Sequence, residues 1–361
     1  MKGFLCMVLL LCGIMGSASG QRIVVAQDGS GKFRNIQDAI NSLDTLSQTE
    51  RVVFIKNGVY NEKLFITRSY VRLQGESEKG VIIQTSLPRD VWRCANPDDW
   101  GAATVNVKGH DLTFENLTIL NTYGFTATKD TVVNCVGESG QNSGTKKAYA
   151  LPREANEPEG SKIVRKNGHQ FAMRSFPGAI RLVFKNCTLR AGGGDTVSPW
   201  DVEAGMYYFQ NCTMEGDVDF YCPRGWAYAE GCRFICHNLN AAIWHDGSNN
   251  ASCKTVLKDC VFEGDPGFKL GRFHKEAQFY LINCQFAETM ADADIYWVTS
   301  APKPLQWGKR VYYYNCHRKG GDFIWHVDNL PTASVSLKQI TPEWTFNGKW
   351  NPLKNKSRQK N

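Results

Sequence analysis

The chain has 361 residues, 42% of them hydrophobic, and a formal net charge of +7. Five of its positive charges are at the ends, at Lys2 and at Lys354, Lys356, Arg358 and Lys360, so the body of the chain is nearly neutral. The composition therefore gives no support for nucleic acid as a partner, and the basic C-terminal run predicts a solvated, disordered tail. A chain of this length buries a large core.

Residues 1–20 have the pattern of a cleavable secretory signal peptide. Lys2 precedes an apolar run from Phe4 to Met15, and small residues follow up to Gly20. A lipoprotein anchored at Cys12 is the alternative, but Leu11 stands where a small residue is expected. No later stretch is long and apolar enough to span a membrane. The sequence therefore predicts a secreted or periplasmic protein.

The segment after residue 34 predicts a short helix. Asn35 and Asp38 form a capping pair, and the apolar stripe consists of Ile36, Ala39, Ile40 and Leu43. Such a helix closes the first coil of a stacked β structure, whose strand edges otherwise promote aggregation.

A strand-and-corner phrase then repeats along the chain. Its corner residues are Asn116, Asn186, Asn211, Gly231, Asp259, Asn283 and Asn315. Short runs rich in Val, Ile, Phe and Tyr with period two, separated by such corners at intervals of roughly 20 to 30 residues, are typical of a solenoid. We predict one all-β domain over residues 21–335, a right-handed single-stranded parallel β-helix in which residues one turn apart lie ~4.8 Å from each other.

Eleven cysteines follow the predicted signal, an odd number, so at least one thiol is unpaired within a monomer. Six directly follow a corner residue: Cys187, Cys212, Cys232, Cys260, Cys284 and Cys316. We interpret these six as a buried ladder rather than as disulfides or metal ligands. Cys232, Cys236 and His237 lack a second ligand pair at a zinc-finger spacing, so no metal site is predicted.

Two aspartates are 24 residues apart, about one turn of this repeat. Asp195 follows three glycines and Asp219 precedes a phenylalanine, so they are expected on adjacent coils. Gln170 precedes Asp195 by 25 residues, and Arg272 follows Asp219 by 53, or two coils. Trp244, His245 and Asp246 fall near the same column.

This set of side chains suits ester hydrolysis. Two carboxyl groups ~5 Å apart do not both ionise easily, so one remains protonated as an acid. Arg272 keeps the other, Asp219, ionised as a nucleophile. Gln170 and protonated Asp195 are expected to stabilise the oxyanion, and Asp195 to act as acid and then base. No metal or other cofactor is required.

At these residues the chain resembles the pectin methylesterases, carbohydrate esterase family 8, which are right-handed parallel β-helices. The resemblance covers residues 22 to 300. It is carried by Gly58-Val-Tyr60-Asn-Glu62, Gln170-Phe-Ala-Met-Arg174, Asp195-Thr196, Asp219-Phe220 and Leu270-Gly-Arg272-Phe-His274. It implies that Asp219 is the nucleophile, Asp195 the acid/base, Arg272 the partner of the carboxylate and Gln170 an oxyanion donor. The implied substrate is a methyl-esterified pectic polysaccharide.

The chain also departs from the family pattern. The second amide donor is replaced by Gly194, the sugar-stacking tryptophan by His274, and the aromatic residue after the acid/base by Ser198. Losing one oxyanion donor costs ~3 kcal/mol of transition-state stabilisation. Substrate binding is expected from His274 and from nearby aromatic residues: Trp200, Trp226, Trp244 and His245. We interpret Cys222 as a packed bystander because no histidine partner is evident.

Residues 137–168 form an inserted loop, either an active-site lid or a solvated insertion. Residues 336–361 form a C-terminal segment that ends in the basic tail. Two other functions remain open, a calcium-dependent polysaccharide lyase and a non-catalytic pectin-binding solenoid. Each site residue also has a structural interpretation, as part of a corner ladder or as a surface ion pair. A monomer is expected.

Overall fold

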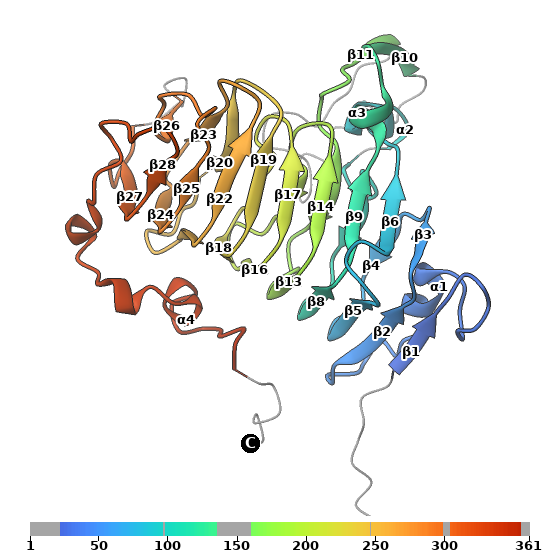
Figure 1. Ribbon diagram of the computed structural model, residues 1–361. Coiled ribbons are helices and arrows are strands. Elements are labelled where there is room, and N and C mark those ends of the chain that lie inside the picture. The colour runs from blue at the N-terminus through green and yellow to red at the C-terminus, as the bar shows by residue number, and fades with distance from the viewer. Residues whose placement is uncertain (1–21, 97, 136–159, 246, 299–303, 355–361) are drawn as a thin grey trace, which may run out of the picture.

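The computed structural model describes residues 22–96, 98–135, 160–245, 247–298 and 304–354. Figure 1 shows one elongated stack of coils, with β1 at one end and β27 and β28 at the other. The long sheets are parallel throughout. The predicted parallel β-helix is therefore confirmed. The predicted signal peptide and residues 355–361 of the basic tail lie outside the described residues.

The first face of the stack is a ten-stranded sheet that spans its whole length. Its inward side chains stack from coil to coil, as in the rings of Phe114, Phe184 and Phe209 at centroid distances of 4.7 and 5.0 Å. Its strands are β1 (Arg22–Val25), β2 (Arg51–Ile55), β5 (Val71–Gly75), β8 (Leu112–Glu115), β13 (Leu182–Lys185), β16 (Met206–Gln210), β18 (Trp226–Glu230), β21 (Thr255–Lys258), β24 (Gln278–Ile282) and β27 (Arg310–Tyr314).

The second face is a nine-stranded sheet that follows the first in each coil after a sharp corner. Its strands are β3 (Gly58–Tyr60), β6 (Val81–Thr85), β9 (Thr118–Asn121), β14 (Thr188–Ala191), β17 (Thr213–Gly216), β19 (Arg233–Cys236), β22 (Val261–Gly264), β25 (Gln285–Phe286) and β28 (His317–Arg318).

The third face is divided into two sheets. One consists of β4 (Leu64–Ile66), β7 (Ala103–Val107), β12 (Phe171–Ser175) and β15 (Val197–Ser198), and the other of β20 (Ala241–His245), β23 (Lys269–Phe273) and β26 (Tyr296–Trp297). Between them, Tyr221 forms isolated bridges to Val197 on one side and to Ile243 on the other. The coil at this break carries Asp219, so the backbone is least regular where the candidate site lies.

The repeated corner residues all have a left-handed backbone. Asn186 has φ 49° and Asn211 has φ 51°, a conformation that Asn, Asp and Gly adopt more readily than other residues. The amide of Asn186 donates to Asn116 at 3.1 Å, and that of Asn315 to Asn283 at 3.0 Å. The six cysteines after these corners are buried and carry free thiols. The predicted ladder is therefore confirmed.

Helix α1 (Ile36–Asn41) packs against β1, β2 and β4 at the first coil, as predicted for a cap. The four residues of its predicted apolar stripe are buried. The predicted capping pair is wrong in one respect, because the Asn35 side chain does not cap the helix. The carboxylate of Glu62 accepts the N–H groups of Ile36 and Gln37 at 2.9 and 3.0 Å instead.

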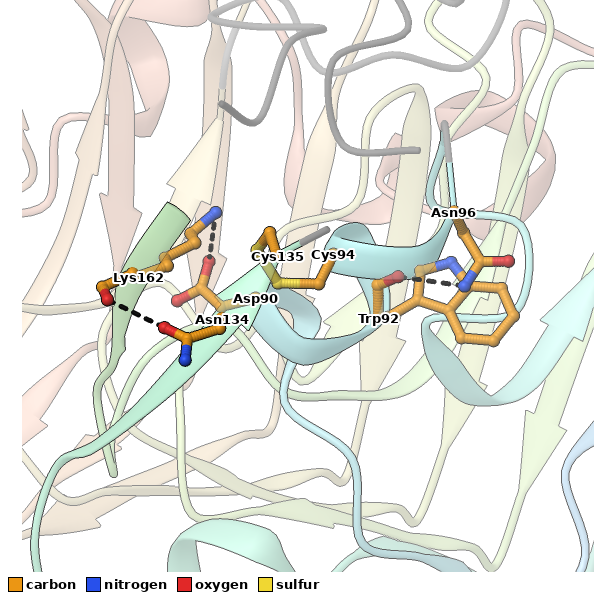
Figure 2. Close-up of a disulfide and its surroundings, with 8 residues drawn as sticks. Asp90, Trp92, Cys94, Asn96, Asn134, Cys135 and Lys162 are labelled. Atoms are coloured by element: carbon orange, nitrogen blue, oxygen red, sulfur yellow. Dashed lines mark hydrogen bonds and ion pairs between the residues drawn. A yellow bond between two sulfur atoms is a disulfide. The ribbon is translucent and has the colours of Figure 1, made fainter. Parts of the chain in front are cut away.

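A disulfide fixes the segment that precedes the predicted insertion. It joins Cys94 in α2 (Arg89–Ala95) to Cys135 in β10 (Thr131–Cys135), as Figure 2 shows. Nearby, the Lys162 ammonium lies 3.4 Å from the Asp90 carboxylate. Strand β11 (Gly160–Val164) pairs antiparallel with β10, so the two ends of the insertion lie side by side. Residues 137–159 of the predicted insertion lie outside the described residues.

The C-terminal segment packs against the outer side of the ten-stranded sheet. Its elements are η3 (Leu330–Ala333), η4 (Leu337–Gln339) and α4 (Pro342–Thr345). Buried Leu330, Ile340 and Phe346 pack there with Trp226 and Tyr228. Much of the predicted segment 336–361 is therefore folded onto the stack. Among the described residues, no helix has both the length and the apolar character needed to cross a membrane.

Candidate active site

Asp195 and Asp219 occupy matching positions on adjacent coils. Val197 and Tyr221, each two residues after an aspartate, form a β-bridge with one another. Trp200 and Arg224, which are also 24 residues apart, form a second bridge. Both aspartates have a left-handed backbone, with φ values of 55° and 56°. The 24-residue spacing in the sequence is thus the length of one coil at this point, and the predicted register of the two carboxyl groups holds in the structure.

Arg272 forms a bidentate pair with Asp219. Its Nε donates to Oδ1 at 3.0 Å and its Nη2 to Oδ2 at 2.7 Å. Arg272 is on β23, where it pairs with Trp244 of β20, and its guanidinium carbon lies 5.1 Å from the Trp244 ring. The arginine therefore reaches Asp219 from two coils away, across the intervening tryptophan, with the planar geometry that favours a carboxylate partner.

The environment of Asp219 suits a carboxylate that changes its charge near neutrality. Burial raises the pKa of Asp219 to about 6, against the opposing effect of the Arg272 guanidinium, while the charge of Asp195 raises it further. Burial disfavours the charged form of an acid, and an opposite charge favours it. Above pH 6 the group is mainly ionised, as a nucleophile requires.

Two residues that sequence reasoning missed flank Asp195. His169 Nε2 lies 3.7 Å from one carboxyl oxygen, and Arg224 Nη2 lies 3.5 Å from the other. His169 bridges Gly194 on the neighbouring coil. Their positions in the sequence indicate that both lie near the site, because His169 directly precedes Gln170 and Arg224 follows Asp219 by five residues on the same coil.

Gln170 is on the predicted coil, but its side chain does not face the carboxyl groups as an available donor. It is fully buried. Its oxygen accepts the N–H of Gly124 at 2.8 Å, and its amide donates to the carbonyl of Lys166 at 2.6 Å. An oxyanion donor must reach the substrate. The structure therefore corrects this prediction, and Gln170 instead ties helix α3 (Tyr123–Thr126) to the turn that contains Lys166.

Aromatic side chains extend the site on both sides of the two aspartates. Trp244 and His274 are half-buried beside Arg272, with ring centroids 5.8 Å apart. Trp200, also half-buried, lies against the guanidinium groups of Arg174 and Arg224 at 5.0 and 4.7 Å. These three predicted binding residues are near the site.

Two other predicted binding residues are inside the protein, which corrects their assignment. Trp226 is 3% exposed, and its indole N–H donates to the carbonyl of Ser252 beneath the C-terminal segment. His245 is 2% exposed and its Nδ1 accepts the N–H of Gly247. Side chains alternate direction along a strand, so His245 points inward where its neighbour Trp244 points outward.

Cys222 is buried, as expected of a packed bystander, and burial raises the pKa of its thiol. Such a thiol is not poised as a nucleophile. Within the part of the chain that the structure describes, no group of three or more His, Cys, Asp or Glu side chains is arranged to hold a metal ion.

The sequence profile of the family described as Pectinesterase matches residues 22–141. "Probable pectinesterase/pectinesterase inhibitor 58" of Arabidopsis thaliana is 26% identical over 254 residues, which are 68% of this chain and 36% of that protein. Pectinesterase A of Dickeya dadantii is 38% identical over 116 residues, 31% of each chain. The chain is thus similar to pectinesterases, over about its first third for the family profile and over 68% of its length for the Arabidopsis protein. It spans about a third of the length of these curated relatives.

Solved pectin methylesterases share the fold of this chain. One, crystallised in complex with a hexasaccharide, has a TM-score of 0.65 and 20% identity, and the match covers 93% of this chain and 99% of that one. The enzyme from carrot gives a TM-score of 0.61 at 18% identity, with 92% and 95% covered. The family profile ends before all four predicted catalytic residues, so their assignment depends on the geometry described above.

Proposed function

We propose that the protein is a carbohydrate esterase that hydrolyses methyl esters of uronate residues in pectin-like polysaccharides and releases methanol. The observation that carries the proposal is the bidentate Asp219–Arg272 pair beside Asp195 on the adjacent coil. One carboxylate has a fixed cationic partner, and a second acidic group lies within its electrostatic reach. This is the arrangement that a carboxylate nucleophile with a separate acid/base needs.

In the first half-reaction the Asp219 carboxylate attacks the carbonyl carbon of the methyl ester. The C–O bond to methoxide then breaks, and Asp195 gives its proton to the departing oxygen, which leaves as methanol. The product on the enzyme is an anhydride between Asp219 and the uronate. Arg272 holds the attacking carboxylate in one orientation, which favours a near-attack geometry.

In the second half-reaction Asp195, now a carboxylate, takes a proton from water as the water attacks the anhydride. The bond to Asp219 breaks, the uronate leaves as a carboxylic acid that gives its proton to the solvent, and both aspartates return to their starting states. No proton is gained or lost by the two aspartates over the cycle. The same residue thus acts as acid and then as base.

The half-buried aromatic residues suit a sugar polymer as substrate. Trp244 and His274 lie on one side of Arg272, and Trp200 lies beside Arg224 on the coil of Asp195. Amphipathic rings at a half-exposed surface bind the apolar faces of sugars while leaving polar groups hydrated. Export by the N-terminal apolar segment and a monomeric state are parts of the same proposal, on sequence grounds.

A product assay on methyl-esterified pectin tests the proposal. The expected result is methanol release matched by new carboxyl groups, one for one, with no ultraviolet-absorbing unsaturated product. An unsaturated product that requires calcium identifies a polysaccharide lyase instead. Binding to pectin without methanol release between pH 5 and pH 9 identifies a non-catalytic solenoid, and either result overturns the esterase proposal.

A further inference from the structure

The arginine beside Asp195 belongs to a buried network that the reaction scheme above does not use. Arg224 is 3% exposed. Its Nη1 donates to the Ser198 hydroxyl at 3.0 Å and to the carbonyl of Cys222 at 2.8 Å, while Nη2 lies 3.5 Å from Asp195 Oδ2. The guanidinium also lies against Trp200. Its orientation is therefore fixed on several sides.

A second arginine shares the same anchors but turns the other way. Arg174 donates to the same Ser198 hydroxyl at 2.6 Å and contacts the same Trp200 ring. Its Nη2 lies 3.5 Å from the fully buried carboxylate of Asp99, which also pairs with Arg89 at 2.8 Å. Ser198 and Trp200 thus contact two guanidinium groups, one beside Asp99 and the other beside Asp195.

We propose that Arg224 is a positioning residue, an inference that rests on the proposed esterase function. Arg224 holds the Asp195 carboxyl group in its reactive orientation and influences the charge of that group. It acts through Asp195 and does not need to touch the substrate. The fork of a guanidinium, unlike an ammonium, holds Ser198, the Cys222 carbonyl and Asp195 at once. This residue also gives a role to Ser198, one of the departures from the family pattern.

Several charged or titratable groups surround Asp195, and each bears on its protonation. They are His169 on the preceding coil, Arg174 on β12, Asp219 on the following coil, and Cys222 and Arg224 in the loop after Asp219. A guanidinium this close interacts favourably with an ionised carboxylate. Arg224 also lowers the pKa of Asp219.

The pH profile of kcat/KM for pectin tests the proposal, with Arg224→Gln and Arg224→Lys as the variants. In the scheme above, the acidic limb reports ionisation of Asp219 and the alkaline limb loss of the Asp195 proton. Arg224→Gln removes the positive charge, so both limbs are expected to move to higher pH by about 1 unit, with kcat at pH 7 lowered about tenfold. Arg224→Lys keeps the charge, so its limbs stay in place while kcat falls.

Arg51→Gln is a matched control. Arg51 is also 3% exposed, but its guanidinium donates to the backbone carbonyls of Asp44 and Ser69 in the first coils. Its replacement is expected to lower stability and leave both limbs unmoved. Limbs that stay in place in folded Arg224→Gln, or move equally in Arg51→Gln, overturn the positioning role. A wild-type protein that releases no methanol contradicts the proposed function itself, a different result.

Ser198→Ala covers the case in which Arg224→Gln does not fold. This variant keeps both guanidinium charges and removes only their shared hydroxyl anchor. The expected result is a few-fold lower kcat, an unchanged KM and unmoved limbs, because the charge beside Asp195 remains. Full wild-type kcat in Ser198→Ala, with Arg224→Lys also fully active, contradicts the role of Arg224 as a fixed positioning group.

Discussion

Two aspartates at the site share an unusual backbone conformation with the corner residues of the stack. Each has φ near +55°, which costs a non-glycine residue about 1 to 2 kcal/mol. At the corners, asparagines form a side-chain ladder in this conformation. On the third face, Asp195 and Asp219 turn instead toward Arg224 and Arg272. The same left-handed backbone thus supports the asparagine ladder at the corners and the charged cluster on the third face.

In the proposed mechanism, Asp219 sets the acidic side of the activity profile. Burial raises the pKa of its carboxyl group to about 6, so the proposed nucleophile is protonated below that pH and ionised above it. We expect kcat/KM to fall about tenfold for each pH unit below about 6. Initial rates between pH 4 and pH 8 measure this, and a profile that is flat down to pH 4 contradicts the assignment.

The backbone around Gly194 leaves no room for the amide side chain that the resemblance to pectin methylesterases implies at this position. A Cβ atom at this position would lie 2.7 Å from the carbonyl oxygen of Val218 on the next coil. Gly194→Ala is expected to lower the free energy of unfolding by about 1 to 3 kcal/mol, and Gly194→Gln to give no gain in kcat. Gly168→Ala is the control, because its nearest contact would be 3.3 Å. A Gly194→Ala variant as stable as the wild type contradicts this close packing.

The repeat length predicted which coils carry the site, and the structure confirms that Asp195, Asp219 and Arg272 come together. It did not predict the direction of each side chain. Gln170 is in register but buried, because its amide satisfies backbone groups of helix α3 and of Lys166. His245 is one residue from Trp244, and a shift of one residue moves a side chain to the other side of a strand.

Among the elements, the N-terminal cap depends on a residue outside the helix. Glu62 accepts two N–H groups at the start of α1, whereas the exposed Asn35 side chain donates only to Asp38 at 3.1 Å. The first N–H groups of a helix have no acceptor within the helix, so they need one from elsewhere. The sequence predicted the helix from its apolar stripe, but a capping contact from 26 residues away leaves no local pattern.

Glu62→Ala is therefore expected to lower the free energy of unfolding by about 1 to 2 kcal/mol, because two N–H groups lose their acceptor. Asn35→Ala is expected to change it by less than about 0.5 kcal/mol. Denaturant unfolding of both variants measures the difference. Equal losses in the two variants would show that Asn35 caps the helix after all.

At the scale of the whole molecule, the stack has a second apolar cluster on its outside. The C-terminal segment covers Trp226, Tyr228 and Tyr280 on the ten-stranded sheet. Figure 1 shows this segment leaving the last coils and running back along the stack. The solenoid period predicted the coils, but the segment lies outside the period, and its apolar residues gave no sign of which face they cover.

Phe346→Ala is expected to lower the free energy of unfolding by about 3 kcal/mol while leaving KM for pectin unchanged. Phe346 is 1% exposed in the cluster that contains Trp226, away from the aspartates. Leu353→Ala, at a side chain 55% exposed, is the control and is expected to change stability by less than about 0.5 kcal/mol. A large rise in KM in folded Phe346→Ala contradicts the purely structural place of this cluster.

The most direct test of the account is methanol release by Asp219→Asn, compared with Asp259→Asn. Asp259 has the same left-handed backbone, φ 53°, but belongs to the corner ladder, where it accepts from Asn283 at 2.8 Å. We expect Asp219→Asn to lose at least about a thousandfold in kcat, because an amide is not a nucleophile, while Asp259→Asn stays within about twofold of the wild type. A folded Asp219→Asn protein that releases methanol at the wild-type rate would contradict the account.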